Sequence, residues 1–179
     1  MPSYHSKISE TTEVVFEEAC GCALMPFRTE TRGPAPPCNP GTEDIIDETI
    51  AFFRANVFFR NFEVKGGADR TLIYLTLYFQ QCLVKCERCT SPEAASKELS
   101  TLAMKAVTSP GEPGWVLGGM YPSGKSKQEG DSFKAYFKQA REEIGRRVVP
   151  LMYSGEGGTK NKWWQAFSKR KFMGKELRD

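Results

Sequence analysis

The chain has 179 residues and a formal net charge of +3, with 40% hydrophobic and 26% charged residues. This composition is typical of a globular protein and excludes the fibrous and predominantly disordered classes. A chain of this length buries roughly 70% of the surface of its unfolded form, so we expect a single domain over residues 1–179.

Positive charge is concentrated in the C-terminal part. Residues 125–179 contain 14 Lys and Arg against 7 Asp and Glu, whereas the residues before them contain 11 against 15. This asymmetry indicates a basic surface that faces an acidic partner, with a purely solvating surface as the alternative. Nucleic acid and acidic proteins are both candidate partners.

The N-terminus and the cysteines indicate an intracellular protein. The first residues, MPSYHSKISETTEVVF, show no basic region followed by an apolar one, so no secretory signal is predicted. The longest apolar run, residues 72–84, is interrupted by three polar residues and is shorter than the ~20 residues of a membrane span. We therefore expect no membrane span and six free thiols.

The first part of the chain, residues 1–41, has little periodicity and contains the Pro-rich sequence GPAPPCNPG. Extended backbone and turns are expected there, with residues 14–16 or 23–27 as candidate short strands. Helical spacing starts at Thr42. We therefore predict an extended N-terminal segment, 1–41, and a helical body, 42–174, within one domain.

The first predicted helix covers residues 42–62. Thr42 is its expected N-cap, and Glu43 and Asp44 lie in the first turn, where acidic side chains complement the helix dipole. Its apolar face is wide enough to need neighbours on two sides. The helix is expected to end before the glycine pair at 66–67.

A second helix is predicted from an N-cap at Asp69 to about Arg88, with apolar residues in nearly every direction, which is typical of a buried helix. Cys82, Cys86 and Cys89 spell C-x-x-x-C-x-x-C, a pattern that in a loop binds an iron–sulfur cluster. On a helix the three lie in one row, so we interpret them as core residues.

Three more helices complete the prediction. Ser91 caps a third helix that ends before Pro110, and a fourth covers residues 129–149 and is ended by Pro150. The last helix is short and reaches Gly174. The predicted fold is therefore all-α: a five-helix bundle with one central helix surrounded by the others and an extended N-terminal segment.

The sequence GMYPSGKS, residues 119–126, matches the G-x-x-x-x-G-K-[ST] pattern of a phosphate-binding loop. That loop requires a buried strand before it and a helix after it. Only Trp115-Val116-Leu117 precede it, between glycines and prolines, and Pro122 lacks an N–H. We interpret the match as a surface turn; a small phosphate-loop nucleotide-binding protein using Gly119 to Ser126 is the alternative function.

No catalytic group is convincing, and we expect no enzyme. The single histidine, His5, lies in a stretch expected to be mobile, so no Ser-His or Cys-His pair is predicted. Glu142 and Glu143 are adjacent on a helix and therefore point in different directions.

Three cysteines of the N-terminal segment are the remaining candidates for a metal site. Cys20, Cys22 and Cys38 offer three thiols, whereas structural zinc sites use four ligands, usually in C-x-x-C pairs. We therefore predict neither a metal nor a cofactor.

The last helix, in KWWQAFSKRKFM, combines large aromatic side chains with a basic triplet. Trp163 and Trp164, followed by Lys169, Arg170 and Lys171, are the candidate protein interface, because tryptophan and arginine are enriched at interfaces. Stacking on nucleic acid is a second hypothesis. For the two tryptophans we favour the interpretation that they, with Phe167, dock the helix onto the body of the protein, while the basic triplet lies in solvent and is the open interface candidate.

Several segments together resemble one known family. They are the sequences YHS, GPAP, DIIDETIAFFRANVFFRNFEVK, ADRTLIYLTLY, PGEPG and KWWQAFSKRKFM, in this order along nearly the whole chain. The chain is thereby similar to the 21 kDa subunits of the actin-related protein 2/3 complex. The stretches 91–108 and 118–127 fit that family poorly, which also disfavours the nucleotide interpretation.

The resemblance implies a non-catalytic structural subunit of a seven-subunit assembly that starts actin filaments as branches on existing filaments. Its implied partners are the other subunits, chiefly the third actin-related protein, and the actin filament, with no nucleic acid. The implied location is the cytoplasm, at branch sites of the actin cytoskeleton. Actin surfaces are mainly acidic, so the basic C-terminal part has the matching charge.

Overall fold

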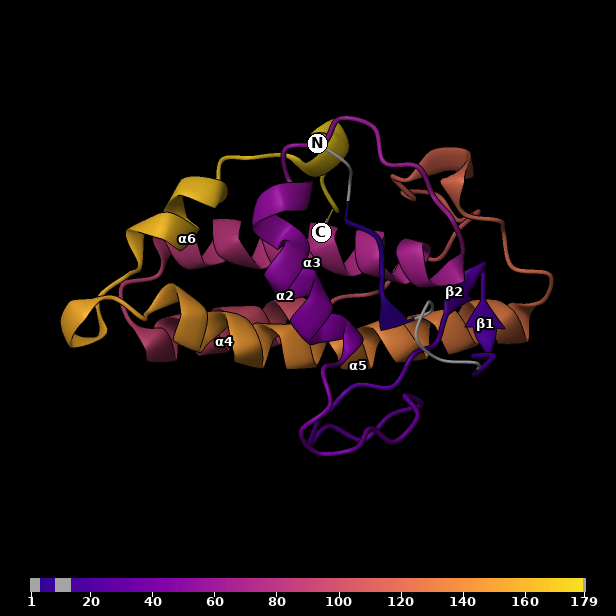
Figure 1. The fold of residues 1–179 in the computed structure, drawn as a ribbon, viewed down its shortest axis with the longest axis horizontal. Coiled ribbons are helices and arrows are strands. Elements are labelled where there is room, and N and C mark those ends of the chain that lie inside the picture. The colour runs from indigo at the N-terminus through magenta and orange to yellow at the C-terminus, as the bar shows by residue number, and fades with distance from the viewer. Residues whose placement is uncertain (1–3, 9–13, 179) are drawn as a thin grey trace.

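Five α-helices form the framework of the described part of the protein. The computed structural model describes residues 4–8 and 14–178, and Figure 1 shows the helices with two short strands at one end. The helices are α2 (Ile45–Asn56), α3 (Gly67–Arg88), α4 (Pro92–Met104), α5 (Lys127–Met152) and α6 (Lys162–Phe167). The expectation of a mainly helical protein is confirmed.

Helix α3 is covered on all sides. Ten consecutive residues, 71–80, are buried, and because a helix turns once every 3.6 residues, this run includes every face of the helix. The helix contacts α2, α4, α5 and α6, the second strand and the C-terminal 3₁₀ turn η3 (Phe172–Gly174). The hydrophobic core is therefore built around α3.

A two-stranded hairpin corrects the expected positions of the strands. Strands β1 (Glu18–Ala19) and β2 (Cys22–Ala23) pair antiparallel, with β2 against α3 and β1 against α5. Cys20 and Gly21 join them with φ angles of 49° and 72°, and positive φ at both central residues defines the tight hairpin turn. Residues 14–16 form no strand, and only Ala23 of residues 23–27 does.

Helix α2 begins later and ends earlier than predicted. Asp44, not Thr42, is the N-cap, and its carboxylate accepts hydrogen bonds from the N–H groups of Ile46 and Asp47. The Asp47 side chain in turn accepts from the Asp44 N–H, which completes a capping box. The helix ends at Asn56, and Phe62 is buried beyond its end.

The N-cap of α3 is a glycine, whereas α4 and α5 each begin with a serine N-cap. Gly66 is the N-cap of α3, and Asp69 lies inside the first turn, in contrast to the prediction. Ser91 caps α4 as predicted, and Ser126 caps α5. The two serine side chains thus accept hydrogen bonds from backbone N–H groups that the first helical turn leaves unpaired.

Two helix ends were predicted wrongly. Helix α5 continues through Pro150 to Met152, because a proline in the last turn removes only one internal hydrogen bond. Helix α6 ends at Phe167 instead of Gly174, and the chain reaches Gly174 through η3, where Met173 has a φ of 52°.

A buried arginine links α5 to α3. Arg141 is only 6% exposed, and its Nε and Nη2 both donate to the Tyr74 hydroxyl, at 3.0 and 2.6 Å. Its guanidinium also lies 5.0 Å from the centre of the Tyr78 ring. Within the described residues Arg141 forms no ion pair, so the two tyrosines stabilise its charge.

This arrangement predicts different effects for two similar substitutions. Tyr74→Phe removes the hydroxyl that accepts from the buried guanidinium and should lower the free energy of unfolding by about 2 kcal/mol. Tyr78→Phe keeps its ring, and the hydroxyl it removes has no hydrogen-bond partner in the described part of the chain. It should change stability by less than about 0.5 kcal/mol. Urea unfolding of both variants tests this, and equal losses would contradict it.

Candidate protein interface

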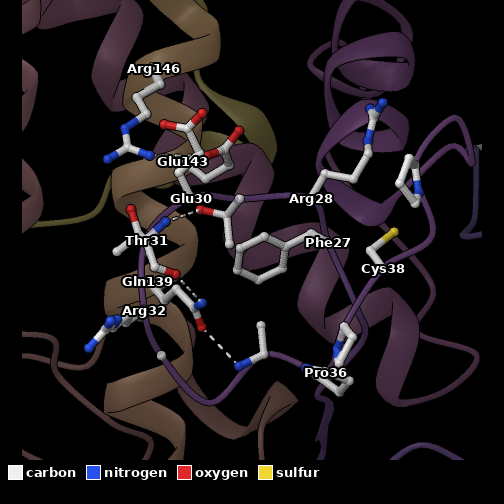
Figure 2. Close-up of a pocket in the computed structure, with 15 residues that line it drawn as sticks. Phe27, Arg28, Glu30, Thr31, Arg32, Pro36, Cys38, Gln139, Glu143 and Arg146 are labelled. Carbon is white, nitrogen blue, oxygen red and sulfur yellow. Dashed lines mark hydrogen bonds and ion pairs between the residues drawn. The ribbon is translucent and has the colours of Figure 1, made fainter.

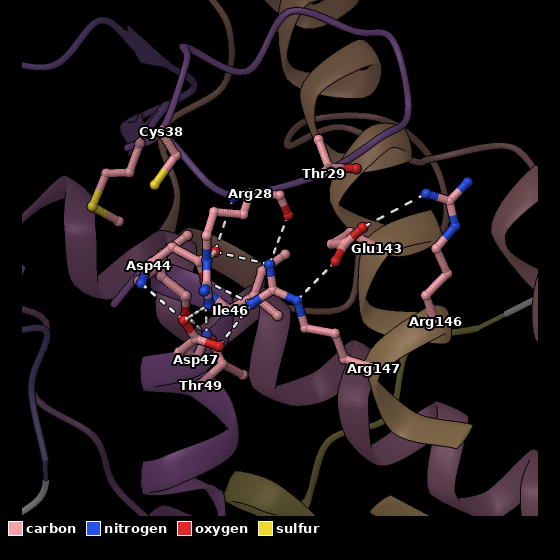
Figure 3. A network of polar contacts seen from close by, with 12 residues as sticks. Arg28, Thr29, Cys38, Asp44, Ile46, Asp47, Thr49, Glu143, Arg146 and Arg147 are labelled. Atoms are coloured by element: carbon pink, nitrogen blue, oxygen red, sulfur yellow. Dashed lines mark hydrogen bonds and ion pairs between the residues drawn. The ribbon is translucent and has the colours of Figure 1, made fainter. Parts of the chain in front are cut away.

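Arg147 of α5 is the centre of a network of ion pairs with α2 (Figure 3). Its Nη1 and Nη2 donate to the two carboxylate oxygens of Asp44, at 2.9 and 2.8 Å. The remaining donors reach Asp47 at 2.8 Å, Glu143 at 2.8 Å and the carbonyl of Arg28 at 2.7 Å. All five donors of the guanidinium are therefore used.

Asp44 joins three parts of the chain through one carboxylate. Besides capping α2 and binding Arg147, it accepts a hydrogen bond from the Arg28 N–H at 2.9 Å. Burial by itself would raise the pKa of Asp44, but the hydrogen bonds from Arg147 and from the backbone hold that pKa below its usual value. The charged form of Asp44 therefore stabilises the fold.

The lowered pKa sets the pH range in which this contribution operates. A carboxyl with a lower pKa in the folded than in the unfolded protein stabilises the fold above its unfolded pKa, about 3.9, and loses that effect as pH falls through the folded value. Asp44→Asn keeps a capping oxygen but removes the charge beside Arg147, which should lower the free energy of unfolding at pH 7 by about 3 kcal/mol.

Denaturant unfolding from pH 7 to pH 3 measures this difference. The gap between wild type and Asp44→Asn should be constant above about pH 5 and should narrow below about pH 4. A gap that does not change with pH would show that the charge of Asp44 has no role in stability.

A cavity of about 790 Å³ lies between the Pro-rich loop that follows Phe27 and helix α5 (Figure 2). Gln139 of α5 holds the loop at two points: its Nε2 donates to the Thr31 carbonyl, and its Oε1 accepts from the Ala35 N–H, both at 2.8 Å. Burial, followed by the charge of Asp44, raises the pKa of the Cys38 thiol in the cavity wall. Cys38 is therefore a poor nucleophile at neutral pH.

The segment that resembles a phosphate-binding loop has a structural role. Its first two residues belong to the 3₁₀ turn η1 (Gly118–Met120), and no strand of the described chain leads into residues 119–126. At the start of α5, the Glu129 carboxylate accepts from the N–H groups of Lys125 and Cys20, at 2.6 and 2.8 Å. These hydrogen bonds lower the pKa of Glu129. Backbone N–H groups near this helix start therefore bind the carboxylate of Glu129, whereas in a phosphate-binding loop they bind a phosphate.

Four of the six cysteines are buried core residues. Cys82 and Cys86 are fully buried on α3, in agreement with the core interpretation, and Cys89 is the half-buried C-cap residue. Cys20 and Cys22 are buried in the hairpin. Among the described residues, no group of three or more His, Cys, Asp or Glu side chains is arranged to hold a metal.

His5 lies in an ordered segment, which corrects the expectation of a mobile one. Its Nδ1 is 2.7 Å from Asp69 Oδ2, and the Ser6 N–H donates to the other oxygen of that carboxylate at 3.1 Å. The Ser6 hydroxyl donates to Glu48 at 2.7 Å, so its proton is committed to a carboxylate. Burial is the main cause that raises the pKa of Glu48. These groups fasten the N-terminal segment to α2 and α3.

The two predicted interface tryptophans have different environments. Trp164 is 8% exposed, and its ring lies 5.5 Å from that of Phe79 and 6.4 Å from that of Phe53. Trp163 is 72% exposed. Because neighbouring residues of a helix point about 100° apart, one tryptophan docks α6 onto the core and the other lies in solvent.

The three residues of the basic triplet are exposed but differ in their partners. Lys171 pairs with Glu176 at 2.9 Å. The guanidinium of Arg170 lies over the ring of Phe58, 5.1 Å from its centre. Lys169 forms no ion pair with any residue whose position is described.

Two residues that sequence reasoning did not single out belong to the same face. Phe58 is 57% exposed just beyond α2, and its ring lies 6.0 Å from that of Phe167. Arg54 of α2 lies over the Trp164 ring at 5.4 Å. The sequence signal for Phe58 is a large aromatic residue directly after the last apolar positions of the first predicted helix. Whether that residue is exposed depends on where α2 ends, which the sequence did not predict correctly.

The fold and this face define a mainly helical protein with an exposed aromatic and basic surface. In the described part of the chain no metal-binding cluster of His, Cys, Asp or Glu is assembled, and no helix has the length and apolar character needed to cross a membrane. What is assembled is an exposed aromatic and basic face on a rigid helical body.

Comparison with known proteins identifies the family. Residues 1–177 match the model of P21-Arc, described as the ARP2/3 complex ARPC3 (21 kDa) subunit, and the chain belongs to this family. The resemblance found in the sequence is thus confirmed.

Relatives from distant organisms agree over nearly the whole length, and each is named actin-related protein 2/3 complex subunit 3, in one case as probable. The protein of Arabidopsis thaliana is 42% identical over 170 residues, which are 95% of this chain and 96% of the relative. The probable subunit of Caenorhabditis elegans is 41% identical over 99% of this chain and 96% of its own length. The protein of Schizosaccharomyces pombe is 41% identical over 99% of this chain and all of its own.

Proposed function

We propose that this protein is a non-catalytic structural subunit of the actin-related protein 2/3 complex. In this role it supports nucleation of branched actin filaments by binding an actin-related subunit, chiefly the third actin-related protein, and the mother filament. The observation that carries the proposal is the family match over residues 1–177, together with relatives at about 40% identity over their full length. The proposed location is the cytoplasm, at branch sites of the actin cytoskeleton.

The properties of the folded chain support a binding role. Its titratable groups in buried positions are used for structure: Asp44, Glu48 and Asp69 each accept backbone or side-chain hydrogen bonds. The excess positive charge of residues 125–179 suits the mainly acidic surface of actin. We propose the face around α6, which contains Trp163 and the triplet 169–171 with Trp164 packed beneath, as a docking surface.

Copurification from cells that express the tagged chain tests the proposal. The tagged protein should recover the actin-related proteins at stoichiometric levels, and its depletion should reduce branch formation in an actin polymerisation assay viewed by microscopy. Recovery of RNA without actin-related proteins would favour the nucleic-acid hypothesis instead. Micromolar ATP affinity of the isolated chain, lost on Lys125→Ala, would establish the nucleotide alternative.

Replacement of the whole triplet separates binding from folding. Lys169→Ala, Arg170→Ala and Lys171→Ala together should weaken assembly or filament attachment, because they remove three positive charges from the proposed surface. The thermal unfolding midpoint should stay close to that of wild type, because exposed side chains contribute little to stability. Unchanged branching by this variant would remove the triplet from the interface.

A further inference from the structure

The C-terminal end of α2 and helix α6 form one composite face, here called the α2–α6 face: Arg54, Phe58, Trp163, Phe167, Lys169 and Arg170. Ring and cation–ring contacts link Arg54, Phe58, Phe167 and Arg170, with the buried Trp164 between Arg54 and Phe167. Arg54 lies over Trp164, Phe167 is 6.0 Å from Phe58, and Arg170 covers the Phe58 ring. Trp163 is one helical turn from Phe167, on the same side of α6. Figure 1 shows α6 close to this end of α2.

The α2–α6 face combines apolar area with uncompensated positive charge. Phe58 and Trp163 are 57% and 72% exposed, unusual values for such large apolar side chains. Within residues 4–8 and 14–178, Arg54, Lys169 and Arg170 form no ion pair with a carboxylate.

We propose that the α2–α6 face binds an acidic segment of a neighbouring protein. Apolar side chains of that segment cover Trp163 and Phe58, and its carboxylates pair with Arg54, Lys169 and Arg170. Charge complementarity selects this partner: rings flanked by guanidinium groups attract carboxylates and repel basic surfaces. The proposal rests on the function proposed above, because it gives the chemistry of a surface through which such a subunit docks.

Two residues that belonged to the sequence-based interface lie outside this surface. Lys171 is neutralised by Glu176, and Trp164 is buried in contact with Phe53 and Phe79. The proposal therefore distinguishes Lys171 from Lys169 and Arg170, although the three are consecutive. Lys171→Ala should leave partner binding unchanged.

Matched substitutions test the contribution of the rings. Trp163→Ala should reduce the affinity of the chain for the remaining subunits about tenfold or more, because exposed tryptophans at the centre of an interface contribute much of the binding energy. Met104→Ala on α4 is the control, since Met104 is 74% exposed, nearly the same as Trp163. The assay is capture of the full-length chain by a complex assembled without it, with thermal unfolding to verify each fold.

Charge reversal tests the chemistry of the partner. Arg54→Glu with Arg170→Glu should weaken capture about tenfold or more. Lys97→Glu with Lys138→Glu makes the same change of charge on exposed positions of α4 and α5 and should have less than about a threefold effect. Raising the salt concentration should weaken binding of wild type more than binding of the Arg54→Glu, Arg170→Glu variant, because salt screens ion pairs.

A photocrosslinking residue at position 163, in otherwise wild-type chain, identifies the segment that binds. The crosslinked peptide should contain more Asp and Glu than Lys and Arg. A basic peptide, no crosslink in the assembled complex, or equal capture of Trp163→Ala and Met104→Ala would overturn the proposal. Failure of the wild-type chain to enter any such complex would instead overturn the proposed function, so the two failures are distinguishable.

Discussion

The complete burial of α3 is the constraint on which the rest of the structure depends. Because residues 71–80 have no free face, their polar side chains rely on partners inside the protein, and only the Tyr78 hydroxyl among them lacks a hydrogen bond in the described part of the chain. The Thr71 hydroxyl donates to the Ala23 carbonyl, Tyr74 accepts from Arg141, and Gln80 accepts from the Phe172 N–H. These bonds reach β2, α5 and η3. The central helix thus positions the elements that cover it.

The N-terminal segment shows how extended backbone is held without a sheet. Its N–H groups need acceptors, and beyond the two-residue strands side chains supply them. Carboxylates at the starts of helices accept from it: Asp44 from Arg28, Asp69 from Ser6 and Glu129 from Cys20. Acidic residues are favoured at helix starts in any case, because they complement the helix dipole. Each of these carboxylates therefore stabilises the start of a helix and at the same time holds the N-terminal segment against that helix.

The predictable features are those set by local pattern. Spacing of apolar residues located α3, α4 and α5, and Ser91 was recognised as a cap because serine followed by proline is a local signal. The N-cap of α2 was placed at Thr42 because threonine followed by two acidic residues is also a local start signal, whereas the structure uses the capping box of Asp44 and Asp47. The candidate interface was located only in part, since the exposure of Phe58 depends on where α2 ends and how α6 packs.

Adjacent tryptophans show how stability and recognition are separated on one short helix. A helix of six residues is too short to be stable alone, so α6 depends on tertiary packing, and Trp164 supplies it by burial against Phe53 and Phe79. Trp163 contributes little to the fold, because most of its surface is in solvent. Folding alone would be served equally well by a polar residue there. The exposed bulk of Trp163 therefore supports the proposal that this side chain contacts another molecule.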